Sequence, residues 1–162
     1  MQTRNNQSGF SLIELLIVVA IIGIIAAIAI PNLLSSRRAA NEGSAQSSMR
    51  IIHSSEATYA ATAGNGSYGN LAALQGQNLV DTVLGGGRKS GYSFVVTPEA
   101  ATTDAAANFA GTGYPQNTTG LTQTGTRRFA ISADGVMRGD TTISGTPPTS
   151  STAISVITVL GN

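Results

Sequence analysis

The chain has 162 residues, which is enough for one folded domain and one membrane anchor. Only 10% of the residues are charged, against about a quarter in an average soluble domain, and the formal net charge is +1. A net charge so close to zero argues against nucleic-acid binding through a broad basic surface. The sequence has no cysteine, which excludes disulfides and thiol chemistry.

The chain opens with a short polar stretch that carries one basic residue, Arg4, and ends in Gly9. A run of 22 residues without a charge, Leu15 to Ser36, follows soon after it. At 1.5 Å per residue a helix of that length covers roughly 33 Å, and a bilayer core is about 30 Å thick. The run therefore predicts a membrane-length helix.

A single carboxylate, Glu14, lies at the start of this apolar block. An ionised group costs about 2.5–3.5 kcal/mol at the centre of a membrane helix, and less near its ends. One interpretation is a carboxylate that reaches the membrane surface. The alternative is a carboxylate with a partner and a function.

The residues Gly9-Phe10-Ser11-Leu12-Ile13-Glu14 resemble the processing site of type IV pilins and type II secretion pseudopilins, closely from Ser8 to about Leu34. The resemblance implies that a prepilin peptidase cuts between Gly9 and Phe10, and that Phe10 is then N-methylated. It also favours the second interpretation of Glu14, in which the carboxylate pairs with the methylated amine of Phe10 on an adjacent subunit. Such a pairing lowers the cost of the buried charge and sets the axial register of neighbouring subunits.

One long helix is predicted from Phe10 to about Thr62, apolar on all sides in its first half. Gly23 and Pro31 are its weak points, and proline predicts a kink because it removes a backbone donor. The resemblance implies that the segment Gly23–Pro31 can lose its helical form inside an assembled filament.

The second half of the helix has an apolar face with spacings of three and four residues. We expect this face to pack against a sheet. Its members are Ala45, Met49, Ile52, Glu56 and Tyr59. Glu42 is expected on another face, paired with Arg38 one turn away.

Glycine and asparagine in residues 63–70 predict the end of the helix. Gly64–Gly69 matches the GxGxxG pattern of dinucleotide sites, but it follows a helix instead of a strand, so a helix-ending turn is preferred. Leu71 to Leu84 predicts a short helix or a loop held by leucines.

Strands are expected in the remainder of the chain, with an Asp134-Gly135 turn joining two of them in a hairpin. The predicted strands are Tyr92–Thr97, Asn108–Tyr114, Arg128–Ser132, Val136–Arg138 and Ala153–Leu160. The fold class predicted is α+β, a long N-terminal helix packed against a small antiparallel sheet, as in pilins. The expected division is a leader (1–9), a helix (10–54) that is membrane-spanning in its first half, and a globular head (55–162).

No catalytic, cofactor or metal site is predicted. His53 is the only histidine, and no GxSxG motif is present. Asp134 and Asp140 alone are a thin ligand set for calcium. The basic doublets Arg88-Lys89 and Arg127-Arg128 lack interleaved aromatic residues, so solvated charges are preferred over a nucleic-acid site.

The resemblance implies a structural subunit of a type IV pilus-like filament, held in the bacterial inner membrane as a precursor and extracellular once assembled. Its implied partners are copies of itself, the prepilin peptidase, and the assembly platform with its ATPase. Two alternatives stay open. One is a pseudopilin of a short periplasmic filament, and the other is a membrane-tethered periplasmic binding module.

Overall fold

The computed structural model describes residues 9–143 and 147–160. In chain order the elements are α1 (Leu12–Ala61), α2 (Leu71–Gly76), α3 (Thr82–Gly85), β1 (Arg88–Lys89), β2 (Tyr92–Glu99), β3 (Asn108–Pro115), β4 (Arg128–Ser132), β5 (Arg138–Asp140) and α4 (Ser151–Ser155). Two compact units meet within α1, the first ending at Ser36 and the second beginning at Arg37. The predicted α+β class with a long N-terminal helix and an antiparallel sheet is confirmed.

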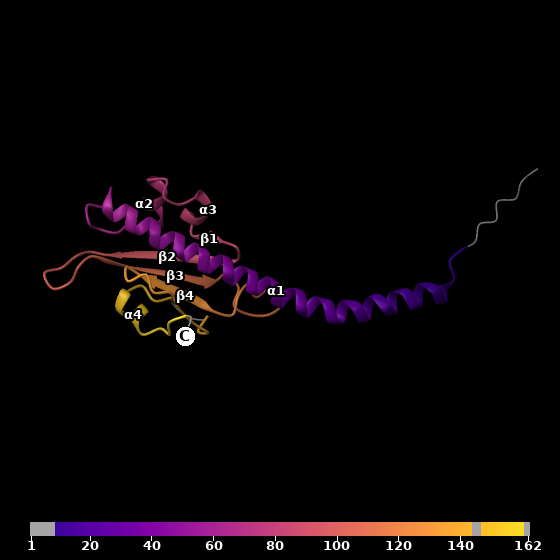
Figure 1. The fold of residues 1–162 in the computed structure, drawn as a ribbon. Helices are drawn as coiled ribbons and strands as arrows, with labels where there is room; N and C mark the ends of the chain where they lie inside the picture. The colour runs from indigo at the N-terminus through magenta and orange to yellow at the C-terminus, as the bar shows by residue number, and fades with distance from the viewer. Residues whose placement is uncertain (1–8, 144–146, 161–162) are drawn as a thin grey trace, which may run out of the picture. The chain divides into compact units, whose positions relative to one another are not determined.

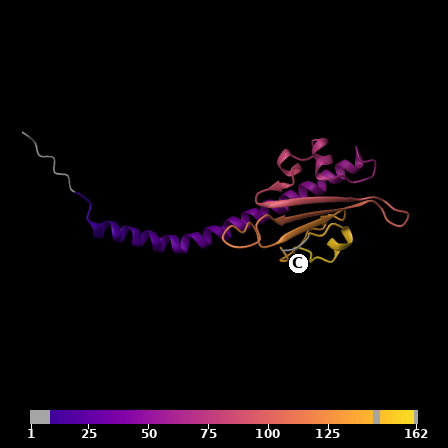
Figure 2. The ribbon, with the colours of Figure 1, turned by 180° about the vertical axis from the view of Figure 1, so that it is seen from behind.

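The second unit is built on a five-stranded antiparallel sheet in the order β1-β2-β3-β4-β5. Strand order equals chain order, so every connection joins neighbouring strands. Residues of α1 from 37 onward lie along one face of the sheet, and α4 lies on the other face (Figures 1 and 2).

The predicted apolar face of α1 packs against this sheet. Ala45, Met49 and Ile52 have no exposed surface, and they belong to the same core as Phe94 and Phe129 of the strands. The expectation from helical spacing is therefore confirmed.

Glycine in β3 lets the helix approach the sheet closely. A Cβ atom added at Gly113 would lie 3.0 Å from the ring of Phe94 and 3.3 Å from the sulfur of Met49. Because Gly113 pairs with Phe94 on one side and Phe129 on the other, two rings flank it and take the place of its missing side chain.

The predicted strands at β2, β3 and β4 are confirmed, with β2 extending beyond its expected end at Thr97 through Pro98 to Glu99. On its outer side β2 pairs with β1 only at Tyr92 and Ser93. Pro98 therefore stands on an edge without a ladder partner there, where its missing N–H costs no sheet hydrogen bond.

The predicted hairpin exists, but its second strand begins at Arg138 and not at Val136. The carboxylate of Asp134 accepts hydrogen bonds from the hydroxyl of Ser132 (2.9 Å), the amide of Val136 (3.0 Å) and the guanidinium of Arg138 (2.6 Å). These bonds hold a wider connection than a two-residue turn, while Gly135 takes the positive φ of 71° that the turn requires.

The predicted final strand Ala153–Leu160 is wrong, because the structure has α4 at its start. Ser150 caps α4 by accepting from the amide of Ala153, and Glu99 accepts from both the amide and the hydroxyl of Ser151. Of the later residues only Val159 pairs with a strand, as one isolated bridge to Arg138.

Apolar packing explains why the helix prevails there. Ile154 lies in α4, and Ile157 lies just beyond its end. The amide of Ile157 donates to the carbonyl of Ile154 at 3.0 Å, and this last turn places both side chains on the same side. Both are buried, and they form a second small core with Ala110 of β3 and Ala130 of β4.

Glu42 is paired differently from the prediction. It is 6% exposed, and one carboxylate oxygen accepts from the amide and the hydroxyl of Thr126 at 2.7 Å each. The other oxygen accepts from Nε of Arg127 at 3.1 Å. The expected partner, Arg38, instead donates to the carbonyl of Gly120.

The environment of Glu42 favours its charged form. Burial raises the pKa of Glu42. The hydrogen bonds from Thr126 and Arg127 and the positive charge of Arg127 lower the pKa by more than burial raises it, so it lies below its ordinary value of 4.5. The ionised carboxylate therefore ties the segment before β4 to α1.

Truncating the buried apolar residue of α4 is expected to destabilise the second unit. Ile154→Ala should lower the free energy of unfolding by about 2–4 kcal/mol, since it leaves a cavity beside Ala110 and Ala130. Val156 is 83% exposed on the same segment, and Val156→Ala should change stability by less than about 0.5 kcal/mol. Thermal unfolding of the full chain in detergent measures both, and equal effects would contradict the packing of α4.

Neutralising Glu42 is expected to change the pH dependence of stability. A folded pKa below 4.5 means that Glu42 stabilises the fold above that pH and loses this contribution as pH falls through the folded pKa. Glu42→Gln should cost about 1–3 kcal/mol at pH 7 and flatten the loss of stability below pH 4.5. Asp104→Asn, at an exposed carboxylate, is the matched control and should keep the wild-type pH profile.

Candidate processing and assembly segment

The candidate segment surrounds the N-terminal end of α1. Gly9 and Phe10 precede the helix, and the Phe10 side chain is 93% exposed. The carbonyl of Ser11 accepts the first helical hydrogen bond, from the amide of Leu15 at 3.2 Å. Ser11 is therefore the N-cap residue of α1, one position after Phe10.

Glu14 interacts with this cap. Its carboxylate accepts a hydrogen bond of 2.9 Å from the backbone amide of Ser11, three residues earlier. This is the glutamate half of a capping box, in which Ser-x-x-Glu satisfies an orphan amide at the start of a helix. A negative charge is also favoured there by the helix dipole. The Ser11-x-x-Glu14 spacing is a readable sequence signal for this role, and the sequence analysis missed it.

Beyond Glu14 the apolar side chains of α1 are exposed on every side of the helix. Between Leu15 and Leu33 the large apolar side chains range in exposure from 51% at Ile17 and Val18 to 68% at Leu33. Among the described residues, α1 is the helix long and apolar enough to cross a membrane. Because so large an apolar surface is unfavourable in water, it needs lipid or other apolar helices around it.

The two expected weak points lie inside continuous helix. A Cβ atom at Gly23 would meet nothing within 4 Å, and α1 stays helical through Pro31. Proline has no N–H, so the carbonyl of Ala27 loses its usual helical donor. The next residue after the proline, Asn32, donates a side-chain hydrogen bond to the carbonyl of Ile28, four residues earlier, at 3.1 Å.

The structure therefore brings two of the expected site residues together and leaves two apart. Phe10 and Glu14 lie within about one turn of each other at the end of the helix. Gly23 and Pro31 lie further along the same helix, about two and a half and nearly five turns beyond Glu14 at about 3.6 residues per turn. The four residues are therefore separate positions along one segment of the chain.

Most of the other charged residues considered for chemistry are engaged in ion pairs of the second unit. Asp134 pairs with Arg138 and Asp140 with Arg128, and within the described ranges no group of three or more His, Cys, Asp or Glu residues is placed to hold a metal. Lys89 pairs with Asp81. These charges serve the fold.

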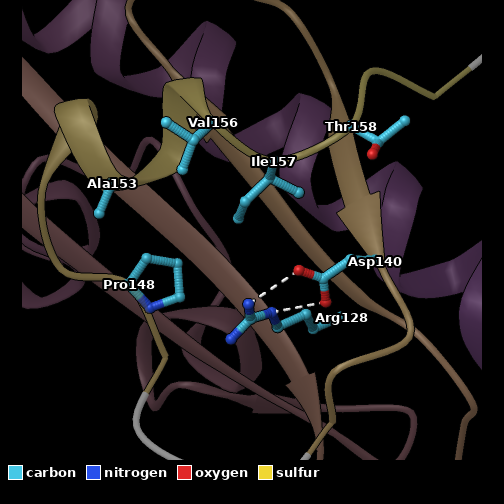
Figure 3. A pocket seen from close by; sticks show the side chains of 7 residues that line it. All are labelled: Arg128, Asp140, Pro148, Ala153, Val156, Ile157 and Thr158. Atoms are coloured by element: carbon cyan, nitrogen blue, oxygen red, sulfur yellow. Dashed lines mark hydrogen bonds and ion pairs between the residues drawn. The ribbon is translucent and has the colours of Figure 1, made fainter.

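A pocket of about 340 Å³ lies beside α4, on the sheet face opposite α1 (Figure 3). Its lining residues are Arg128, Asp140, Pro148, Ala153, Val156, Ile157 and Thr158. Both carboxylate oxygens of Asp140 accept from Arg128 at 2.8 Å. The carboxylate of Asp140 is thus already paired with the other charged residue of the lining.

Glu56 is a buried titratable group that the sequence analysis placed correctly on the packed face of α1 without recognising its chemistry. Burial raises the pKa of Glu56 to about 7, and the amide of Gly69 only partly opposes this effect. No local sequence signal could have identified it, because the contact with Gly69 depends on how the chain folds back after α1.

Part of the chain is similar to known proteins. The family described as the prokaryotic N-terminal methylation motif matches residues 4–30. The chain is 65% identical over 37 residues to the type IV wide pilus major component PilA4 of Thermus thermophilus, covering 23% of this chain and 28% of that protein. It is 43% identical over 51 residues to the type IV major pilin protein PilA of Myxococcus xanthus, covering 32% of this chain and 23% of that protein.

These matches span about a quarter of the length of the curated relatives, and no solved structure matches the chain. The family match at residues 4–30 includes the Gly9–Glu14 motif and most of the exposed apolar half of α1. Over this limited part of its length, the chain is similar to type IV pilins and to the prokaryotic N-terminal methylation motif.

Proposed function

We propose that this protein is a structural subunit of a type IV pilus-like filament. The observation that carries the proposal is the processing-type motif directly before a helix whose apolar side chains are exposed all round. The similarity of this same segment to two pilins supports it. In this proposal residues 1–9 are a leader peptide, removed by cleavage between Gly9 and Phe10, and Phe10 is then N-methylated.

The same apolar surface serves two environments in turn. Before assembly it lies in the lipid of the inner membrane, and afterwards it packs against the helices of other copies of the chain. Association between such helices depends on van der Waals packing, which small residues favour because they let backbones approach. Gly23, Ala26, Ala27 and Ala29 supply such positions.

Glu14 is proposed to join neighbouring subunits through the methylated amine of Phe10. Its bond to the Ser11 amide holds the carboxylate at the helix start, near the new N-terminus of its own chain. A carboxylate that enters an apolar bundle is stabilised by a charged, hydrogen-bonded partner. Only one axial offset between subunits brings amine and carboxylate together, so the pair would set the register.

The segment Gly23–Pro31 is proposed to supply flexibility to the packed helix. Glycine disfavours helix by about 1 kcal/mol relative to alanine, and proline leaves the Ala27 carbonyl without a helical donor. This segment is helical in the isolated chain. Local loss of helix on assembly would let the two ends of α1 adjust to different neighbours.

The proposed partners are further copies of the chain, the prepilin peptidase, the inner membrane, and the assembly platform with its ATPase. No catalytic role is proposed. Both named relatives are pilins, which favours an extracellular pilus over the periplasmic filament of a pseudopilin. The sequence-based division at residue 54 stays a proposal for where the filament core ends.

Mass spectrometry of the mature protein tests the processing step. The expected N-terminal fragment begins at Phe10 and carries one added methyl group. Gly9→Val, which places a β-branched residue before the cut, should leave the leader attached, whereas Ser8→Ala should be processed normally. An intact N-terminus in the wild-type protein would contradict the assignment.

Filament yield tests the role of Glu14. Glu14→Gln keeps the shape of the side chain and its hydrogen bond to Ser11 but removes the charge. Sheared filaments should fall about tenfold or more, which corresponds to a loss of roughly 1.4 kcal/mol or more per subunit contact. Membrane insertion and cleavage should be unchanged. Asp104→Asn, which removes an exposed head charge, is the control and should assemble normally.

Two other outcomes of this experiment would redirect the proposal. Normal filaments from Glu14→Gln would exclude the pairing with Phe10. Retention of the wild-type protein in the cell envelope, without sheared filaments, would favour a pseudopilin or a tethered module over a pilin.

A further inference from the structure

Glu56 of α1 is an ionisable group inside the core of the second unit. Its side chain has no exposed surface. One carboxylate oxygen, Oε2, accepts from the backbone amide of Gly69 at 2.9 Å. The other, Oε1, is buried and has no hydrogen-bond partner among the described residues. A buried carboxylate with a single neutral donor is costly when it is charged.

The bond to Gly69 closes the segment that leads from α1 to α2, residues 62–70. The chain reverses there through Asn65 and Gly66, which have positive φ angles of 48° and 86°. Gly69 then comes so close to the helix that an added Cβ would lie 3.1 Å from the ring of Tyr59. The Glu56 carboxyl is therefore one anchor at the returning end of this segment, beside Tyr68, whose ring packs on Phe109.

Among the described residues, no cation compensates the charge of Glu56. On α1 the nearest titratable side chains are His53 and Tyr59, one turn to either side, and the 62–70 segment contributes Tyr68. From β3 the ring of Phe109 packs on His53 and Tyr68, with centroids 6.2 Å and 5.1 Å away. None of these groups donates a hydrogen bond to Glu56 in the described structure.

The acidic side chain of strand β2 is Glu99. It lines, together with Tyr68, a separate pocket of about 230 Å³. Both of its carboxylate oxygens accept from Ser151, so it faces α4 and holds its own partners. Glu99 is therefore no partner for Glu56 among the described residues.

We propose that Glu56 is a proton-operated latch, which holds residues 62–70 against α1 when it is protonated and releases them when it ionises. A neutral carboxyl needs little hydration and keeps its bond to the Gly69 amide. A charged one needs water at Oε1, and the surface segment above it is the part that can move to admit water. The contact of Leu71 and Leu74 with the core lies beyond Gly69 and keeps α2 in place.

The direction of the pH effect follows from burial, which raises the pKa of Glu56 from 4.5 to about 7. Between these two values the folded protein keeps a proton that the unfolded chain has lost. Stability therefore falls as pH rises through this window, with an increase of about tenfold per pH unit in the unfolding equilibrium constant. The segment should be closed at pH 5 and open above pH 8. This latch does not depend on whether the chain forms a filament.

Spin labelling of the full chain in detergent micelles tests the latch. Because the sequence has no cysteine, Ser67→Cys gives one unique attachment site on the segment. The mobility of the label is expected to rise between pH 5 and pH 9 with a midpoint near 7. A label at Thr103→Cys, on the exposed loop between β2 and β3, should show no such transition.

Glu56→Gln is the decisive variant, since glutamine keeps an acceptor for the Gly69 amide but cannot ionise. Its Ser67→Cys label should stay immobile across the whole pH range. A wild-type label without a transition, or a transition that persists unchanged in Glu56→Gln, would overturn the proposal.

Nuclear magnetic resonance of the wild-type chain gives a test that needs no variant at position 56. The amide proton of Gly69 donates to the carboxyl, so its chemical shift follows the titration of Glu56. A midpoint near 7 is expected. A midpoint between 4 and 5 would show that the charged form is accommodated without opening, and would overturn the proposal.

Discussion

The whole chain depends on one helix that must satisfy two kinds of surroundings. The apolar side chains of α1 before residue 34 are exposed on all sides, so they require lipid or other helices. From Arg37 onward the same helix is amphipathic, and Ala45, Met49 and Ile52 are covered by the sheet. Without the sheet the second half would have no partner for its apolar face, and without an apolar environment the first half would not be tolerated.

The three glutamates of α1 show how the surroundings of a carboxylate decide its role. Each carboxylate accepts a hydrogen bond from a backbone amide: Glu14 from Ser11, Glu42 from Thr126, and Glu56 from Gly69. Glu42 also accepts hydrogen bonds from the hydroxyl of Thr126 and the guanidinium of Arg127, so its charged form is stabilised and its pKa is lowered. Glu56 has one amide and no cation, so burial dominates and its pKa rises. Glu42 is therefore a permanent anchor, whereas Glu56 is the group proposed to respond to pH.

The end of the chain is held without covalent staples. Arg128 and Asp140 form a two-pronged pair across β4 and β5, and Asp134 organises the turn between these strands. Glu99 holds the start of α4 through Ser151. Partly buried, bidentate pairs of this kind contribute more than exposed ones, because their geometry is fixed and solvent screens them less. They take the place that a disulfide would have in a chain with cysteines.

The sequence by itself determined the features that depend on local pattern: the processing motif, the membrane-length apolar run, the packed face of α1, and the strands β2, β3 and β4. Tertiary structure decided the rest. The residues Ala153–Leu160 suit a strand by composition, yet the Ser150 cap, the Glu99 carboxylate and the small core around Ile154 make a helix at their start. Glu42 pairs with Arg127, 85 residues away in the sequence, and not with Arg38 one turn away. Glu56 is buried because the segment that contains Gly69 folds back over it. In each case the deciding groups are brought together only when the chain folds, so no local pattern could have predicted the outcome.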